Sequence, residues 1–363
     1  MKRVVISATS STEGGPLTVL DEMLRAAERI FDASWEIIVL VHNKGLITSQ
    51  RAKIIEIPLV RKSWFVRLYY EWFGYYKISK KFPPDLWVAL NDMTPRVSSA
   101  RQVVYCHNAT PFYSVALEEA KLEPKLLLFS FVYKYAYAHR IHNNYAVVVQ
   151  QNWLRKAFFD IFHHRNIVVA HPVASEGKLG GGEIGKENLT IFLYPTFPRV
   201  FKNIEIICEA IKLIPSEMRK RIQVRITIDG TENRYSRSLI ERYGRLECVK
   251  FIGRLDLSEV TEQYHKCQCV LFPSKLETWG LPISEGKLFG KRLLVADLPY
   301  AYEAVGTYKD VEFLPISDAT AWAGAMGAIL QNSWYPPGNI QIDPPAPYAP
   351  NWDRLWEILI CDL

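Results

Sequence analysis

The feature that most constrains the fold is an alternation of short apolar runs with amphipathic helical stretches. Such alternation is typical of βαβ units, in which consecutive strands lie parallel in one sheet. In the first half we expect strands at Val4–Ser7, Glu36–Val41, Lys53–Ile57, Leu86–Leu90, Gln102–Cys106, Ala146–Gln150 and Ile167–Ala170. Helical spacing of apolar residues predicts helices at Leu17–Ile30 and Asn152–Phe162.

The second half repeats the pattern. Expected strands are Leu189–Tyr194, Gln223–Ile228, Cys248–Ile252, Cys269–Phe272, Arg292–Ala296 and Val311–Leu314, with helices at Ile204–Ile214, Tyr235–Tyr243, Leu257–His265 and Ile283–Phe289. Residues 174–186 contain Gly180-Gly181-Gly182 without an apolar period, which is linker composition. We therefore predict an α/β chain with two Rossmann-like, doubly wound domains at 1–173 and 187–345, followed by a closing helix, Trp352–Ile360, within 346–363.

The composition is that of a globular protein and not of a disordered one. The 363 residues suffice for two cores, 49% are hydrophobic and 23% charged, and the net charge of +6 is mild. The six cysteines show no C-x-x-C spacing, which favours reduced, buried thiols. No apolar run approaches the ~20 residues that span a bilayer, so we expect a cytoplasmic protein.

The stretch Glu277-Thr278-Trp279-Gly280-Leu281-Pro282-Ile283-Ser284-Glu285 follows one of the expected strands and opens a helix. Parallel sheets bind ligands at this edge, and the free N–H groups of a helix N-terminus suit a diphosphate. Gly280 would let the backbone approach the ligand, Glu277 would accept hydrogen bonds from sugar hydroxyls, and Glu285 from another diol such as a ribose. Alternatively, an acidic residue in a first helical turn stabilises the helix without any ligand.

This stretch resembles the E-x7-E element of retaining glycosyltransferases of family 4, which have the GT-B fold and in which two Rossmann-like domains face a cleft. The usual form is E-G-F-G-L-P-x-x-E-A; here Thr278, Trp279 and Gly286 replace Gly, Phe and Ala. Phe251-Ile252-Gly253-Arg254 is similar to the family's loop beside the nucleotide base. The resemblance is strong in the second half and loose in the first, and it points to the bacterial surface-polysaccharide type.

The resemblance also assigns cations to the donor diphosphate. Family members carry G-R-x4-K-G after the first strand of the second domain, where this chain has Tyr194-Pro-Thr-Phe-Pro-Arg-Val-Phe-Lys-Asn203. Lys202 matches the lysine, whereas the arginine position falls on Phe197, so Arg199 would have to substitute. A lysine that begins a helix is otherwise a solvated side chain.

In the first half, three loops follow expected strands. Gly14 and Gly15 form a small-residue turn that can offer amides to phosphate, although tight turns use glycine without a ligand too. In the resembled family such a loop faces the donor diphosphate, and a histidine like His107 approaches the transferred sugar. Asp92 and Asn108 are the expected acceptor residues.

The segment 61–82 interleaves cations with aromatic residues, and 125–140 continues the theme. Such a surface suits an anionic membrane interface. It equally suits a helix that packs its aromatic rings inward and keeps its lysines in water.

The resemblance implies a retaining hexosyltransferase that moves a sugar from a UDP- or GDP-linked donor to a glycan or lipid-linked glycan, at the inner face of the cell membrane. Glu277, His107 and Lys202 are the expected catalytic residues. We see no D-x-D motif and expect neither metal nor cofactor, nor nucleic-acid binding. The alternatives are a sugar-nucleotide epimerase and a non-catalytic subunit that binds a nucleotide or glycan.

Overall fold

The computed structural model describes residues 1–12, 14–172, 189–336, 338–340, 343–361 and 363. The chain divides into two compact units. Unit 1 comprises Met1–Phe112, Phe129–Ser175 and Pro344–Leu363, and unit 2 comprises Tyr113–Leu128 and Glu176–Asp343. The expected linker at 174–186 lies outside the described residues.

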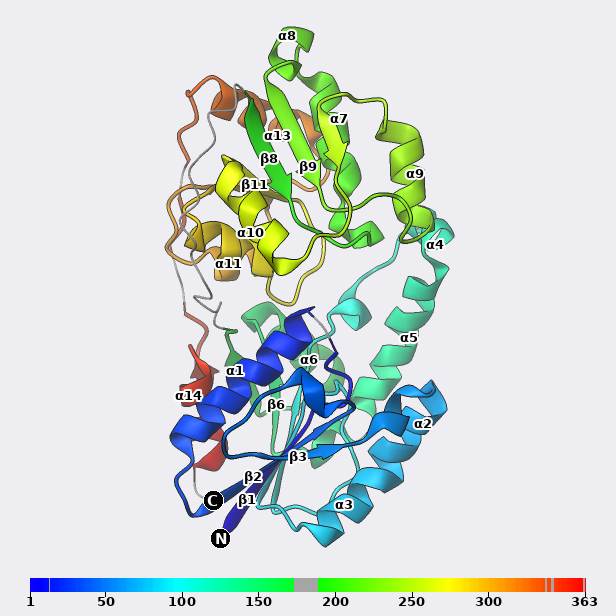
Figure 1. Cartoon of the computed structure of the whole chain (residues 1–363), viewed down its shortest axis with the longest axis vertical. Helices are drawn as coiled ribbons and strands as arrows, with labels where there is room; N and C mark the ends of the chain where they lie inside the picture. The colour runs from blue at the N-terminus through cyan, green and yellow to red at the C-terminus, as the bar shows by residue number, and fades with distance from the viewer. Residues whose placement is uncertain (13, 173–188, 337, 341–342, 362) are drawn as a thin grey trace. The chain divides into compact units, whose positions relative to one another are not determined.

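Unit 1 is built on a parallel sheet with the strand order β14-β7-β6-β5-β4-β1-β2-β3 (Figure 1). Its strands are β1 (Lys2–Ser7), β2 (Trp35–Val41), β3 (Lys53–Glu56), β4 (Leu86–Ala89), β5 (Arg101–Tyr105), β6 (Ala146–Val149), β7 (Ile167–Ala170) and β14 (Tyr348–Ala349). The central strands are buried on both faces, as their unbroken runs of Val, Ile and Leu predict.

The helices of unit 1 lie mostly in the segments that connect its strands. They are α1 (Gly14–Ile30), η1 (Lys44–Leu46), η2 (Pro58–Arg61), α2 (Trp64–Tyr69), the π-helix η3 (Tyr70–Gly74), α3 (Tyr75–Lys81), η4 (Thr110–Phe112), α5 (Pro124–Ala138), η5 (Ile141–Asn143), α6 (Asn152–Phe162) and α14 (Trp352–Ile360). The chain leaves unit 1 after η4 and returns within α5.

Helix α14 belongs to the core of unit 1. Trp352, Leu355, Trp356 and Leu359 are buried at helical spacing, and α14 packs along α1 (Figure 1). The Trp356 ring lies 5.1 Å from the Phe31 ring. The closing helix, which we expected within a separate segment 346–363, is therefore part of unit 1, where α1 covers its apolar stripe.

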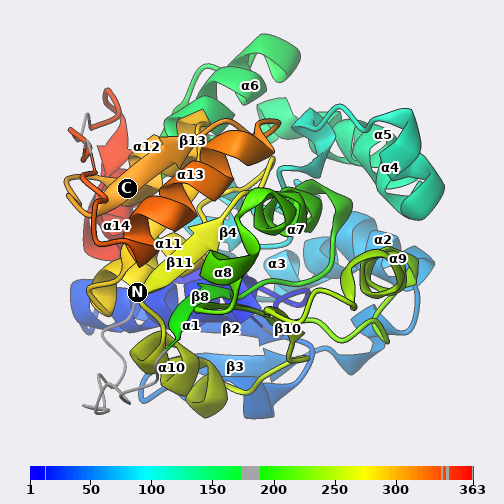
Figure 2. The ribbon, with the colours of Figure 1, turned by 90° about the horizontal axis from the view of Figure 1, so that it is seen from above.

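Unit 2 carries a parallel sheet with the order β10-β9-β8-β11-β12-β13. Its strands are β8 (Thr190–Tyr194), β9 (Ile222–Ile226), β10 (Val249–Phe251), β11 (Cys269–Phe272), β12 (Arg292–Ala296) and β13 (Val311–Leu314). Its helices are α4 (Leu117–Leu122), η6 (Val200–Lys202), α7 (Ile204–Leu213), α8 (Ser216–Arg219), α9 (Arg234–Tyr243), α10 (Leu257–Lys266), α11 (Leu281–Leu288), α12 (Pro299–Val305) and α13 (Ala319–Leu330). Helix α7 packs against α13 beside the sheet (Figure 2).

All the strands expected from the sequence are present, with ends that shift by one or two residues. Strand β14 was not expected, because it lies in the proline-rich tail. Residues 113–128 also differ from expectation, since they join unit 2. No helix in the described part of the chain is long and apolar enough to cross a membrane.

Candidate active site

The site in unit 2 begins where β8 and β11, neighbours in the sheet, both end. Helix η6 follows β8 and presents Lys202, and the loop after β11 presents Glu277. The Lys202 Nζ donates a hydrogen bond to Glu277 Oε1. Both side chains are largely shielded, with 16% and 14% exposed. The two residues expected to bind the donor, 75 positions apart in sequence, therefore meet as an ion pair.

The backbone around Lys202 is held from two sides. The buried Tyr194 hydroxyl donates to the Lys202 carbonyl at 2.6 Å. Asn203 adopts a positive φ of 55°, and its side-chain amide donates to the carbonyls of Pro273, at 3.2 Å, and Ile316, at 2.9 Å. These bonds fasten η6 to the loops after β11 and β13, and so hold the Lys202 backbone beside the loop that carries Glu277.

Gly280 forms the bend between that loop and α11. Its φ of +95° lies in the region that favours glycine, and an added Cβ would lie 3.1 Å from the Phe272 ring. The preceding Trp279 is buried and donates from Nε1 to Ser284 Oγ at 2.9 Å. Trp279 therefore fixes the turn from inside, while Thr278 and Leu281 beside it are partly exposed. Helix α11 begins here and directs its free N–H groups out of the carboxyl edge of the sheet.

Glu285 lies one turn into α11. Its Oε2 accepts a hydrogen bond of 2.5 Å from the hydroxyl of the buried Tyr264. Burial raises the pKa of Glu285, while the Tyr264 hydrogen bond acts in the opposite direction. One carboxyl oxygen is thus fixed by the protein, which orients the group. Binding of a ribose diol by Glu285 stays a prediction.

Arg199 has a partner that the sequence did not indicate. Its Nε lies 2.5 Å from Glu123 Oε1, and Glu123 Oε2 accepts from the Val200 N–H at 3.1 Å. Phe197, which occupies the family's arginine position, is well exposed, and the Arg254 guanidinium lies 5.8 Å from its ring centroid. A role for Arg199 or Arg254 on the donor stays a prediction.

Helix α4, from the first half of the sequence, makes a second ionic contact within unit 2. Glu119 pairs with Lys275 at 2.9 Å and accepts from the Tyr113 hydroxyl at 2.7 Å. Glu119 and Glu123 thus form ion pairs with Lys275 and Arg199, two cations near the candidate donor site. Sequence reasoning missed both glutamates, because no local pattern links them to partners so remote in the chain.

The loop before α10 contains Gly253, expected beside the nucleotide base. Gly253 has a φ of +75°, and its N–H donates to the Ile228 carbonyl at 3.1 Å. An added Cβ would lie 3.3 Å from Asp229 Oδ2. Glycine is therefore required for the backbone path itself, and contact with a base stays a prediction.

In unit 1, the loops after β4 and β5 are joined by Asp92. Its Oδ1 accepts from the backbone N–H groups of His107, at 2.5 Å, and Asn108, at 3.2 Å. The Tyr137 hydroxyl donates to the same oxygen at 3.2 Å. Asn108 in turn accepts from the Thr110 N–H at 2.9 Å. Asp92 thus positions His107, and the acceptor roles of Asp92 and Asn108 stay predictions.

His107 keeps one ring nitrogen unengaged. One ring nitrogen bonds the Leu90 backbone, and no partner among the described residues reaches Nε2, although that atom is buried. Burial lowers the pKa of His107, while the Asp92 carboxylate and the Leu90 bond act in the opposite direction. A neutral ring that donates to a carbonyl from Nδ1 leaves Nε2 as an acceptor for a hydroxyl.

The glycine turn after β1 opens α1. Gly14 has a φ of 61°, and an added Cβ would meet nothing within 4 Å, so space remains beside it. Gly15 follows within the helix. Upstream, Asn91 Oδ1 accepts from the Ser10 N–H at 3.1 Å and from its hydroxyl at 2.8 Å. This bond ties the turn to the loop after β4, and phosphate binding by the turn stays a prediction.

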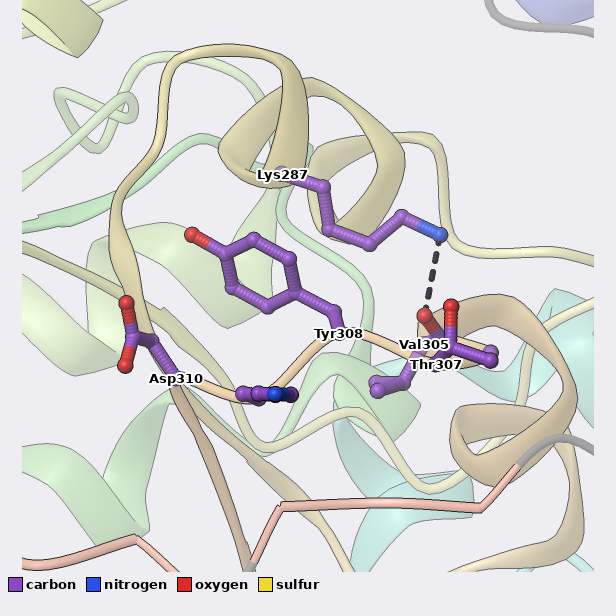
Figure 3. Close-up of a pocket in the computed structure, with 7 residues that line it drawn as sticks. Lys287, Val305, Thr307, Tyr308 and Asp310 are labelled. Atoms are coloured by element: carbon purple, nitrogen blue, oxygen red, sulfur yellow. Dashed lines mark hydrogen bonds between the residues drawn. The ribbon is translucent and has the colours of Figure 1, made fainter.

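A cavity of about 490 Å³ lies elsewhere in unit 2, beside the last turn of α11 (Figure 3). Lys287 extends along it and donates to the carbonyls of Ala304, at 2.5 Å, and Val305, at 3.1 Å. Burial lowers the pKa of Lys287. Because a cation on the last carbonyls of α12 stabilises that helix end, Lys287 has a structural role here. The described residues contain no group of three or more His, Cys, Asp or Glu that could hold a metal ion.

The second half of the chain matches a known protein family. Residues 181–338 match the model of the family described as "Glycosyl transferases group 1". The chain carries a group 1 glycosyltransferase domain. Lys202, Glu277, Gly280 and Glu285 all lie within the matched range of this domain. A comparison with curated proteins found no match.

Solved structures show that the likeness extends over both units. The sucrose-phosphate synthase of Thermosynechococcus elongatus is 16% identical, covers 92% of this chain and 90% of its own, and superposes with a TM-score of 0.62. The lipopolysaccharide-biosynthesis glycosyltransferase WaaG is 15% identical, with 90% of each chain covered and a TM-score of 0.63. The Anabaena protein HepE in complex with UDP and glucose is 14% identical, with 92% of this chain and 91% of its own covered and a TM-score of 0.61. At these identities the structures show the fold, which is GT-B.

Proposed function

We propose that this glycosyltransferase takes a sugar from a UDP- or GDP-linked donor bound at the carboxyl edge of the unit 2 sheet. The observation that carries the proposal is the shielded pair of Lys202 and Glu277 beside the N-terminus of α11. A cation and a row of free N–H groups suit a diphosphate, and a carboxylate suits sugar hydroxyls. HepE was solved with UDP and glucose, which supports a nucleotide sugar as the donor class here.

The pair suggests how the donor is received. A diphosphate that approaches Lys202 would replace the carboxylate as the partner of the ammonium group. Glu277 would then be released to accept hydrogen bonds from hydroxyls of the bound sugar. The attraction between Lys202 and the diphosphate would grow stronger as negative charge develops on the leaving group, because the ammonium group is partly shielded from water.

The remaining steps follow the family resemblance. The anomeric configuration would be retained, with the acceptor attacking from the face that the diphosphate leaves. The diphosphate oxygen would take the acceptor proton, so no protein base is needed. His107 would accept at Nε2 a hydrogen bond from a hydroxyl of the transferred sugar. Protein cations would neutralise the diphosphate, and the reaction would need no metal ion.

We propose a glycan or lipid-linked glycan as the acceptor, met at the cytoplasmic face of the cell membrane. WaaG belongs to lipopolysaccharide biosynthesis, which favours a surface-polysaccharide acceptor by analogy of fold. The cationic and aromatic segments of unit 1 support a lipid-linked substrate.

The test combines binding and turnover. A panel of UDP- and GDP-sugars is screened by thermal shift, since a saturating donor raises stability by RT ln(1 + [L]/Kd). The selected donor is then incubated with and without lipid-linked glycan extracts, and the anomeric configuration of the product is read by NMR. Donor binding with neither sugar transfer nor donor hydrolysis would favour the non-catalytic subunit. Conversion of the donor sugar to its epimer would favour the epimerase.

A further inference from the structure

Helix α5 buries only one of its faces. Leu126, Ser130 and Tyr137 are buried and Tyr133 is half-buried, and these positions recur at helical spacing. The other faces of a solvated helix normally carry polar residues. Here they carry six large apolar side chains with 37–65% of their surface exposed: Leu127, Leu128, Phe129, Phe131, Val132 and Tyr135. Lys125 and Lys134 are the charged residues of the helix.

A second exposed stripe lies on α2 and η3. Phe65, Tyr69 and Phe73 follow at i, i+4 and i+8, so they lie along one helix face. Their exposed fractions are 81%, 47% and 50%. The rings of Tyr69 and Phe73 lie 5.8 Å apart, so they are neighbours along this face.

The two stripes lie on neighbouring helices of unit 1. The Trp64 ring of α2 lies 6.2 Å from the Tyr133 ring of α5, and the Trp72 ring of η3 lies 5.5 Å from the His139 ring just after α5. Figures 1 and 2 both show α2 and α5 next to each other. We call the exposed residues of the two helices, Phe65, Tyr69, Phe73, Phe129, Phe131, Val132 and Tyr135, the α2–α5 surface.

Within the two chain segments that carry this surface, the exposed charges have one sign. Within residues 58–82 and 124–140 the only acidic residue is Glu71, which is fully buried. The exposed charged residues of these segments are Arg61, Lys62, Lys77, Lys80, Lys81, Lys125 and Lys134. A second copy of the chain on a two-fold axis would bring these cations against one another. An anionic surface complements them.

We propose that the α2–α5 surface docks on an anionic lipid bilayer. Aromatic side chains rest at the headgroup level of membranes, aliphatic ones reach the acyl boundary, and lysines pair with anionic lipids. Phe65, Phe131 and Tyr135 are the most exposed rings and would enter first. Docking does not depend on the proposed donor chemistry, so it can be tested without substrate.

The proposed membrane contact includes only part of the segment 61–82 that the sequence analysis identified. Within 61–82, Tyr75 is buried, and Trp72 and Tyr76 are half-buried, so their rings pack inward as the alternative interpretation held. Lys77, Lys80 and Lys81 would add long-range attraction, whereas insertion would depend on α5 and the Phe65 stripe.

The experiment measures binding of the whole chain to vesicles of phosphatidylcholine, with and without phosphatidylglycerol, by co-sedimentation. Wild type should bind the anionic vesicles preferentially, and added salt should weaken binding. The triple variant Phe65→Ser, Phe131→Ser, Tyr135→Ser should bind at least about tenfold more weakly, because it loses the inserted rings. Charge reversal at Lys77, Lys80 and Lys81 should weaken binding at low salt and have less effect at high salt.

The matched control is Leu257→Ser, Tyr335→Ser in unit 2, which removes apolar side chains that are 84% and 89% exposed. This control should bind like wild type, and circular dichroism should show both variants folded. Equal binding by the triple variant and wild type, or no binding of wild type to anionic vesicles at low salt, would overturn the proposal. A concentration-dependent dimer in light scattering that the triple variant abolishes would assign the surface to a second copy instead.

Discussion

Separate substitutions of Lys202 and Glu277 should have different effects: loss of Lys202 should weaken donor binding, and loss of the Glu277 carboxylate should slow transfer. In Glu277→Gln the ammonium keeps a neutral acceptor, so the charged hydrogen bond becomes an ordinary one and unfolding free energy falls by about 1 kcal/mol. In Lys202→Met a carboxylate with only 14% of its side chain exposed loses its partner, which costs about 2–3 kcal/mol. Both variants should therefore fold.

Their effects on the donor should be opposite. Lys202→Met removes the cation for the diphosphate and should weaken nucleotide binding by roughly 1.5–3 kcal/mol, about 10- to 150-fold. Glu277→Gln removes the carboxylate that competes with the diphosphate for Lys202, so this variant should bind the nucleotide as well as wild type or better. Transfer by Glu277→Gln should fall at least about a hundredfold, because the sugar is no longer held in its reactive orientation.

Isothermal calorimetry with the nucleotide diphosphate selected by thermal shift measures binding, urea denaturation measures stability, and nucleotide release measures transfer. The matched control is the solvent-exposed pair of Glu217, on α8, and Lys220, directly after that helix, altered in the same way. Wild-type binding by Lys202→Met together with wild-type transfer by Glu277→Gln would show that the donor site lies elsewhere.

Three further outcomes are expected. Transfer should persist in excess chelator, and complete loss with rescue by manganese would contradict a diphosphate neutralised by protein cations. Glu123→Gln should free Arg199, which is 40% exposed, and tighten nucleotide binding by about two- to tenfold in calorimetry; an unchanged affinity would show that Arg199 does not reach the diphosphate. Burial raises the pKa of Glu71 from 4.5 to about 8, so the folded state holds a proton that the unfolded state releases. Wild-type stability should therefore fall relative to Glu71→Gln as pH rises between these two values, by at most about 1.4 kcal/mol per pH unit, and parallel pH profiles in urea denaturation would refute this.

Much of the fold follows from local sequence patterns. The apolar runs Cys269–Phe272 and Arg292–Ala296 are strands with the expected ends, and Trp352–Ile360 is a helix with the expected ends. Apolar spacing and the punctuation by Gly and Pro act over a few residues, so a single sequence carries them in full. The placement of the 277–285 stretch at a carboxyl edge follows in the same way, since a strand and a helix flank it.

The tertiary structure alone decided which side chains have partners. Glu119 and Glu123 come from the first half of the sequence, yet they pair with Lys275 and Arg199 of unit 2. Strand β14 forms within a proline-rich tail because β7 offers it a free edge. A charge pair depends on the distance between atoms remote in the chain, and the chain's local preferences contain no information about that distance. The sequence therefore identified Arg199 as a candidate cation for the diphosphate, and only the folded chain revealed that a carboxylate already lies against it.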